Sequence, residues 1–211
     1  SHELKTPLQG IIGSAELLES GMVKEGDVPR FVGHIRDEAQ RLVTLIGDII
    51  RLSQLDEGVD VPREPVDLLA VANEAAHDLQ GAAEARKVTL TVDGERAQIV
   101  GARRLLYEIV YNLCENAVKY NREGGSVSVH VAQSDSWVSV RVADTGIGIA
   151  PEHQSRIFER FYRVDKSHSK ASGGTGLGLS IVKHAVAYHH GMIDLQSEPG
   201  KGTTITVTFP K

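Results

Sequence analysis

Two glycine-rich motifs contain the residues whose chemistry is easiest to interpret. The first is Asp144-Thr145-Gly146-Ile147-Gly148, and the second is Gly174-Thr175-Gly176-Leu177-Gly178-Leu179 at the start of an expected helix. Glycine lets the backbone approach a ligand closely, and a helix N-terminus offers unpaired N–H groups to phosphates. A carboxylate such as Asp144 is an acceptor suited to the amino group of adenine. Either motif alone could be a tight turn, but the pair predicts a nucleotide site.

Polar residues recur along one face of the long helix expected between Ala102 and Tyr120. Asn112, Asn116 and Lys119 share this face because they are four and three residues apart. Amide oxygens can hold Mg²⁺ directly or through water, and lysine can neutralise phosphate charge. Glu108, one turn earlier, could polarise a metal-bound water or Asn112, or it could be a surface charge. The alternative for the whole row is helix capping and solvated polar side chains.

Aromatic and cationic residues alternate in the segment from Phe158 to Arg163. Arg163 could reach a terminal phosphate, or the segment could only anchor the next loop to the core. The following stretch, Val164 to Gly173, is rich in Ser, Lys and Gly and has almost no apolar anchor. This composition predicts a mobile lid over a ligand, with His168 exposed rather than catalytic.

The first residues of the chain hold a candidate nucleophile. His2 and Thr6 share a face of the expected first helix, and Glu3 follows the histidine. Imidazole is largely neutral and nucleophilic at pH 7, and a neighbouring carboxylate can orient it and accept its proton. Pro7 predicts a kink just after His2. The alternative is that Pro7 starts the helix and His2 lies in a frayed leader.

The elements that would position these groups divide the chain into two domains. Residues 1–57 read as two antiparallel helices, with a turn from Gly21 to Asp27. Apolar residues in the second helix recur at steps of four and three, at Val28, Val32, Ile35, Ala39, Leu42, Ile46 and Ile49. This heptad seam cannot be buried by an isolated hairpin, so we expect a homodimer through residues 1–57 that forms a four-helix bundle.

Residues 58–65 read as a linker, and residues 66–211 mix helices with hairpin-like strands. The patterns predict helices at 67–85, 102–120, 151–159 and 176–190, and strands at 88–92, 98–100, 126–132, 137–142, 193–196 and 204–209. This order favours an α+β fold in which helices cover one face of a mixed sheet, an α/β sandwich.

Composition excludes several classes of protein. A formal net charge of −5 argues against nucleic acid as the main partner. The single cysteine, Cys114, excludes an internal disulfide and a cysteine-rich zinc site, consistent with a reducing compartment. No apolar run is long enough to span a bilayer, and no Gly-x-x-x-x-Gly-Lys-[Ser/Thr] motif of P-loop enzymes is present.

Taken together, the motifs resemble the sequence boxes of bacterial two-component sensor histidine kinases. Ser1 to Leu8 resembles the phosphoacceptor box, Asn112 to Tyr120 the asparagine box and Asp144 to Gly148 the first glycine box. Phe158 to Arg163 resembles the phenylalanine box, Gly174 to Leu179 the second glycine box, and Gly200-Lys201-Gly202-Thr203-Thr204 the closing glycine turn. The boxes occur in the family's order and cover essentially the whole chain.

The resemblance implies a function and a set of site residues. It implies a dimerisation and phosphotransfer bundle followed by an ATP-binding (Bergerat) domain. ATP and Mg²⁺ would phosphorylate His2 with help from Glu3, and the phosphoryl group would pass to an aspartate on a response regulator receiver domain. A threonine placed like Thr6 implies an additional regulator phosphatase activity. The implied ATP-binding residues are Asn112, Asn116, Lys119, Tyr120, Asp144, Gly146, Gly148, Arg163, Gly174, Thr175, Gly176, Leu177, Gly178 and Thr203, with Asn116 the main Mg²⁺ ligand. From its position alone, Glu108 could be a further metal contact through water.

Three features depart from the family's pattern. Gly101-Ala102 stands where many relatives have Gly-Asp, which predicts the loss of a helix cap, and position 108 is Glu where Gln is frequent. His2 lies at the second residue, so we expect preceding helical turns and upstream sensor segments in a longer parent, a bacterial inner-membrane sensor with this region in the cytoplasm. The residues leave open whether phosphoryl transfer runs within one chain or between subunits.

Overall fold

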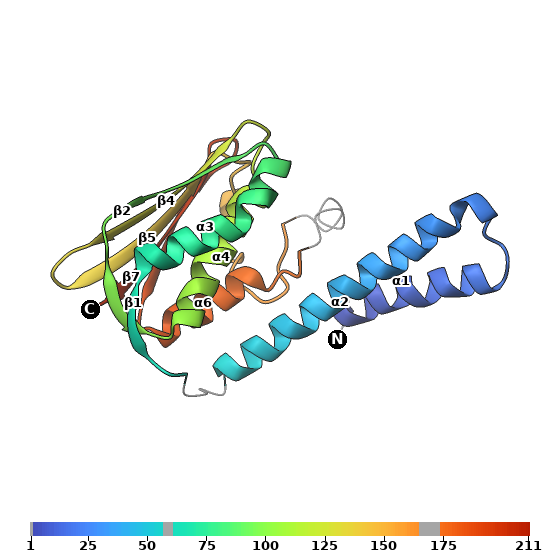
Figure 1. The fold of residues 1–211 in the computed structure, drawn as a ribbon, viewed down its shortest axis with the longest axis horizontal. Coiled ribbons are helices and arrows are strands. Elements are labelled where there is room, and N and C mark those ends of the chain that lie inside the picture. Colours follow the sequence, from blue (N-terminus) through green and yellow to red (C-terminus); the bar gives the residue numbers. More distant parts are fainter. Residues whose placement is uncertain (1, 57–60, 165–173) are drawn as a thin grey trace.

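The protein begins with a long helical hairpin. The computed structural model describes residues 2–56, 61–164 and 174–211. Helix α1 (His2–Glu19) continues through Pro7, and a short 3₁₀ turn, η1 (Glu25–Asp27), leads into α2 (Val28–Asp56). The two helices run side by side and project from the rest of the molecule as an arm (Figure 1). We call residues 2–56 the hairpin, and its two antiparallel helices are those expected from the sequence.

The remainder, residues 61–211, is built on a five-stranded mixed sheet, and we call it the sheet domain. The strand order is β2-β4-β5-β7-β6, in which β2 pairs parallel to β4 and the other pairs are antiparallel. The strands are β2 (Thr89–Gly94), β4 (Ser126–Gln133), β5 (Trp137–Asp144), β6 (Met192–Glu198) and β7 (Gly202–Pro210). The expected hairpin of two alternating strands is β4–β5, and the mixed sheet is confirmed.

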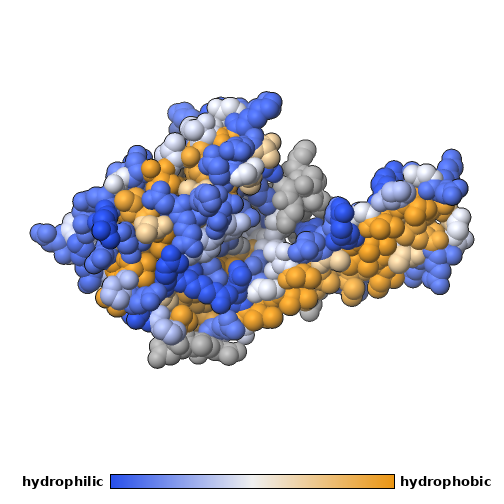
Figure 2. All heavy atoms as spheres, viewed as in Figure 1, coloured by the Kyte–Doolittle hydropathy of each residue, from blue (hydrophilic) through white to orange (hydrophobic). Residues whose placement is uncertain are grey.

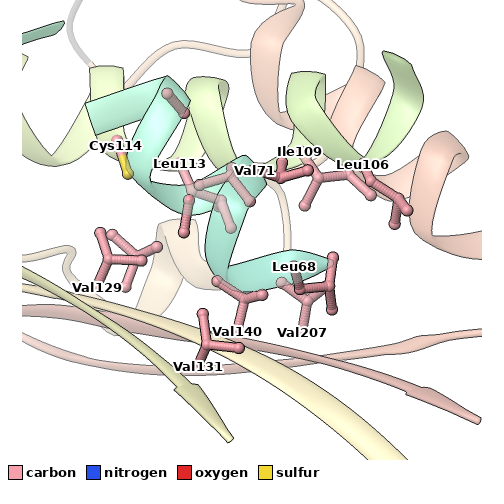
Figure 3. Close-up of a cluster of buried hydrophobic side chains, with 14 of the residues drawn as sticks. Leu68, Val71, Leu106, Ile109, Leu113, Cys114, Val129, Val131, Val140 and Val207 are labelled. Carbon is pink, nitrogen blue, oxygen red and sulfur yellow. The ribbon is translucent and has the colours of Figure 1, made fainter. Parts of the chain in front are cut away.

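Three helices cover one face of this sheet (Figure 1). They are α3 (Leu68–Ala85), α4 (Arg103–Lys119) and α6 (Gly178–Tyr188). Their apolar faces meet the inward side chains of the sheet in one core, in which Leu68, Ile109 and Val140 are at most 1 % exposed (Figure 3). The strands alternate because only one sheet face is buried: Val127, Val129 and Val131 point inward between exposed neighbours. The α+β architecture expected from the sequence is therefore confirmed.

A small second sheet combines the predicted strand near residue 98 with a strand that begins at the end of the predicted linker. Strand β1 (Glu64–Asp67) pairs antiparallel with β3 (Gln98–Gly101), so regular structure begins inside the range expected to be irregular. Pro65 is tolerated because β1 is an edge strand. Asp67 then caps α3, accepting a 3.0 Å hydrogen bond from the Leu69 N–H.

Two helices are shorter than their sequence patterns predicted. The short helix α5 spans only Pro151–Gln154, and turns replace it before Glu159. Helix α6 begins at Gly178 rather than Gly176, because Gly176 has a φ of +74° and cannot belong to a right-handed helix. The expected lid falls mostly on residues 165–173, and His168 with it, outside the described residues.

The hairpin leaves many apolar side chains in contact with solvent. Leu8, Ile12, Leu17, Val32, Val43, Ile46 and Ile50 are between 40 and 65 % exposed, and we call these residues the apolar stripe. Figure 2 shows a continuous hydrophobic surface along this arm. Among the described residues, no helix is both long and apolar enough to cross a membrane.

Candidate active site

Asp144 lies at the end of β5 and is held by two backbone donors. Its Oδ1 accepts hydrogen bonds from the N–H of Gly146 at 2.8 Å and of Thr203 at 3.2 Å. Burial raises the pKa of this carboxyl, and the two backbone hydrogen bonds act in the opposite direction. Within the described residues Oδ2 makes no hydrogen bond, so one oxygen of a fixed carboxylate can receive a ligand donor.

The first glycine motif packs between the end of α4 and the turn joining β6 to β7. Gly148 has a φ of +67°, and a Cβ there would lie 2.0 Å from the Glu198 carbonyl oxygen. The Ile147 N–H donates to the Tyr120 carbonyl at 3.1 Å, which attaches the motif to α4. Asp144 and Thr203 line an open depression of about 340 Å³ beside this turn. Close backbone packing thus requires glycine at position 148, and the first residue of the motif borders a small depression.

The predicted row on α4 faces the second glycine motif. Asn112 Nδ2 donates to the Glu108 carbonyl oxygen at 2.7 Å, and a Cβ at Gly178 would lie 2.6 Å from Asn112 Oδ1. A Cβ at Gly174 would lie 2.4 Å from Lys119 Nζ. Asn116 lies between them on the same face, half-buried, and its side chain makes no hydrogen bond with the described residues. The row and the motif expected to bind one ligand are therefore adjacent.

Cations gather where α4 ends. Burial lowers the pKa of Lys119, which Glu115 opposes and Arg163, Arg86 and Arg41 reinforce. Burial also lowers the pKa of Arg163, while Tyr120 and Glu3 oppose that effect. Positive groups crowded together and partly desolvated are costly unless an anion joins them. This arrangement suits phosphate, the chemistry predicted for both residues.

The second glycine motif is also tied to the hairpin. Thr175 Oγ1 donates a 2.8 Å hydrogen bond to Asp48 Oδ2 on α2, and the Leu177 N–H donates to Thr175 Oγ1 at 3.3 Å. Leu177 is completely buried. Thr175 and Leu177, both predicted to contact ATP, thus have side chains engaged by protein, while the backbone of the motif faces α4.

Glu108 has a different environment from the one its sequence position suggested. It is 7 % exposed, and its Oε1 lies 3.3 Å from Arg104 Nε and 3.6 Å from Arg51 Nε. A buried carboxylate is stabilised by such partners. The surface charge considered from the sequence is wrong, because the carboxylate is buried between two guanidinium groups, whereas its contact with a metal through water stays a prediction.

The predicted phosphoacceptor segment forms the first turns of α1. His2 begins the helix, Glu3 is half-buried and Thr6 is exposed. Leu4 packs against a buried cluster formed by Leu45 and Leu52 of α2 with Ile181 of α6 and Leu177, which immediately precedes α6. The start of α1 therefore lies at the junction between the hairpin and the sheet domain.

Sequence reasoning missed the residues of α2 that contact the sheet domain. Asp48 and Arg51 contact Thr175 and Glu108, and Arg41 influences the pKa values of the clustered cations. The available signal was a carboxylate inside the apolar run from Leu45 to Ile50. A buried charge among apolar neighbours indicates a specific partner, but the sequence could not say which.

Comparisons with known proteins agree with this geometry. The His Kinase A (phospho-acceptor) domain model matches residues 1–58, and the model of histidine kinase-, DNA gyrase B- and HSP90-like ATPases matches residues 101–211. The sensor-like histidine kinase SenX3 of Mycolicibacterium smegmatis is 39 % identical over 100 % of this chain. The phosphate regulon sensor protein PhoR of Pseudomonas aeruginosa is 37 % identical over 99 %. The chain spans 56 % and 48 % of these relatives.

Solved structures show the same arrangement of elements. Full-length ShkA in complex with AMPPNP matches 99 % of this chain with a TM-score of 0.75 and 28 % identity, over 44 % of its own length. The histidine kinase ThkA, in complex with the response regulator protein TrrA, matches 100 % of the chain and 59 % of its own, with a TM-score of 0.78 and 19 % identity. The second likeness concerns the fold alone.

A phosphoacceptor hairpin joined to an ATPase domain of this type defines the histidine kinases. The chain belongs to this family and is the catalytic region of a sensor histidine kinase, the enzyme class of two-component signal transduction.

Proposed function

We propose that the chain transfers the γ-phosphoryl group of ATP to His2, which then passes it to an aspartate on a response regulator receiver domain. The observation that carries the proposal is the arrangement around α4. Its face holds Asn112 and Lys119 against Gly178 and Gly174, and its end contacts the motif that begins with Asp144. One helix thus connects an acceptor suited to adenine with cations suited to phosphates.

The residues present fit ATP and Mg²⁺. The Asn116 amide oxygen would hold the metal, which would neutralise phosphate charge when bound. Lys119 and Arg163 would contact the phosphates, since phosphoryl transfer depends mainly on positioning and charge stabilisation. Asp144 would accept from the adenine amino group through Oδ2. Glu108 could act through water on the metal only after Arg51 withdraws from its carboxylate.

His2 would supply the attacking nitrogen. Its lone pair forms the N–P bond while the bond from the γ-phosphorus to the bridging oxygen breaks, and that electron pair leaves with ADP. The second ring nitrogen becomes acidic when the imidazole is phosphorylated, and the Glu3 carboxylate accepts its proton. Thr6, one turn further along α1 and exposed, would orient water for dephosphorylation of the response regulator.

The wider assembly follows from the hairpin. The apolar stripe supports a homodimer in which two hairpins form a four-helix bundle. The relatives are longer than this chain, which supports upstream sensor segments in a longer parent. We place this region in the cytoplasm of a bacterium, beneath an inner-membrane sensor, where ATP is available and Cys114 stays reduced.

Phosphoryl incorporation from γ-labelled ATP with Mg²⁺ tests the proposal. The wild-type chain should acquire label that is stable to base and labile to acid, as a phosphoramidate is. His2→Ala should abolish the label with nucleotide binding intact, whereas Asn116→Ala should abolish it through loss of the metal. Label retained in His2→Ala would overturn the assignment of the nucleophile. A wild-type protein that binds ATP without labelling would favour a regulator phosphatase acting through Thr6.

A further inference from the structure

An apolar cluster joins the hairpin to the sheet domain of the same chain. Leu45 and Leu52 of α2 pack with Leu177 and Ile181 at the start of α6, and all four are at most 3 % exposed. Phe161 of the phenylalanine box packs against the same cluster. Because these side chains are almost completely removed from water, the hydrophobic effect stabilises the contact between the two domains.

Polar contacts surround this cluster on both sides. The Thr175 hydroxyl donates to Asp48, and Arg51 lies 3.6 Å from Glu108. At the end of α2, Arg160 Nη2 donates to both oxygens of Asp56 at 2.7 and 2.8 Å. Each of these pairs joins a residue of α2 to a residue of the sheet domain. The pairs therefore specify the position along α2 at which the sheet domain docks.

This docking brings the cations of the candidate active site toward the start of the chain's own α1. Leu4, two residues after His2, and Phe161, two residues before Arg163, both pack against this apolar cluster. The charge of Glu3, the neighbour of His2, acts to raise the pKa of Arg163, and the charge of Arg41 on α2 acts to lower the pKa of Lys119. The phosphate side of the site therefore faces the hairpin of the same chain.

The same-chain contact is compatible with a dimer. Leu45, Asp48, Leu52 and Asp56 lie on one face of α2, and the exposed Val43, Ile46 and Ile50 lie roughly half a turn away around the helix axis. A second hairpin can cover the apolar stripe without displacing the sheet domain.

We propose that phosphoryl transfer runs within one chain, from ATP held by a sheet domain to the His2 of the hairpin on which that domain is docked. The inference rests on the proposed function and adds which subunit's histidine receives the phosphoryl group. The bonds made and broken are those described for His2 above. Docking raises the effective concentration of the two reacting groups and removes part of the cost of orienting them.

A heterodimer with one defective ATP site tests this directly. Two full-length parent chains with tags of different size, one wild type and one carrying Asn116→Ala, are coexpressed, purified through both tags and given γ-labelled ATP. We expect the label on the wild-type chain to exceed that on the Asn116→Ala chain by roughly a hundredfold, the scale on which loss of a transition-state contact acts. Label mainly on the Asn116→Ala chain would show transfer between subunits and overturn the proposal.

Two controls separate this inference from the proposed function. A heterodimer of wild type with His2→Ala should label the wild-type chain in either direction of transfer, which shows that a dimer with one altered subunit is competent. An unlabelled wild-type homodimer would contradict the proposed kinase function itself, whereas label on the Asn116→Ala chain contradicts only its direction.

Cross-linking gives a readout that does not depend on activity. In Asp56→Cys/Arg160→Cys, a short bis-maleimide should join the two positions within one chain, so the product should migrate as a monomer on a denaturing gel. A covalent dimer would place the contact between subunits and overturn the proposal. Neither position belongs to the candidate active site, and the native Cys114 is buried.

Discussion

Thr175 and Asp48 are hydrogen-bonded at 2.8 Å although they are 127 residues apart in the sequence. One belongs to the second glycine motif of the sheet domain and the other to the long helix of the hairpin. Burial raises the pKa of Asp48, while the Thr175 hydrogen bond and Arg51 oppose this effect. Docking thus desolvates a carboxylate and provides it with a specific donor.

Asp48→Ala should reduce autophosphorylation while ATP affinity remains unchanged. Loss of a hydrogen bond to a charged group costs about 1.5–3 kcal/mol, which lowers the equilibrium constant for docking by roughly 10- to 150-fold. Asp48→Asn is the matched control because its amide oxygen still accepts from Thr175. Initial rates of labelling and the Kd of a non-hydrolysable ATP analogue distinguish the effects. Equal rates for Asp48→Ala and wild type would mean that this bond does not position the domain.

Asp144→Asn should weaken nucleotide binding by roughly a hundredfold, since a charge-assisted hydrogen bond is lost and an amide donor can face the adenine amino group. The pKa of Asp144 is raised, so the carboxylate is lost at a higher pH than for an exposed aspartate. Wild-type affinity should therefore fall as pH is lowered into that range, and the Asp144→Asn variant should lack this limb. Calorimetric titration across pH 4 to 8 checks both outcomes. A parallel pH profile in the variant would assign the titration to another group.

His189→Gln should change the pH dependence of stability. His189 is 4 % exposed, its Nδ1 donates to the Ala185 carbonyl at 2.8 Å, and its Nε2 accepts from the Ala102 N–H at 3.0 Å. The Ala102 bond needs an unprotonated Nε2, and burial lowers the pKa of His189 below its usual value although the Ala185 bond opposes this effect.

Stability from this neutral histidine is fully present above the unfolded-state pKa of about 6.5 and is lost as pH falls toward the lowered folded pKa. The free energy of unfolding should then decrease by up to about 1.4 kcal/mol per pH unit in that window. Urea unfolding at pH 7 and pH 5.5 should show a smaller decrease in the glutamine variant. An identical decrease in both proteins would exclude His189 as the source.

Cys114 should react with thiol reagents only when the sheet domain opens. It is fully buried, and burial raises the pKa of its thiol to about 12. Reaction with a disulfide reagent at pH 8 should be far slower than for an unfolded control, and a bound ATP analogue should slow it further because ligand binding stabilises the native state. Fast labelling of the native protein would contradict the burial.

Ile46→Asp should dissociate the proposed dimer. Ile46 is 44 % exposed in the chain alone, and a two-fold interface would bury it twice. Loss of two such contacts should raise the dimer Kd by roughly a thousandfold or more. Met22→Asp is the control, because Met22 lies in the turn and is 74 % exposed. Light scattering at micromolar concentration measures the masses, and equal masses for the two variants would argue against the apolar stripe as the interface.

The sequence was most informative where structure depends on nearby residues. The spacing of Asn112, Asn116 and Lys119 depends only on the helical repeat, and the structure places the first and last of them against the second glycine motif. The strands β4 and β5 were predicted from alternation because one sheet face is solvated. Helix periodicity likewise predicted α1 and α2.

Contacts between distant segments were not predictable in this way. Glu108 was considered a metal contact or a surface charge, but its partner Arg51 comes from the hairpin. The sequence predicted a missing cap at Ala102, and there the Ala102 side chain makes no capping hydrogen bond. It could not predict that His189, from the end of α6, would accept the Ala102 N–H. Arg51 and His189 could be read from the sequence, but their proximity to Glu108 and Ala102 could not.

The contacts of α2 with the sheet domain have a mechanical consequence. Leu45, Asp48, Leu52 and Asp56 are three, four and four residues apart, so they form a single line along the helix. Turning α2 about its own axis by about 100°, the angle between successive residues, would carry all four away from the sheet domain together. Bending α2 near its first turns would leave them in place. The docking of the sheet domain therefore responds to the rotation of one helix much more than to its bending.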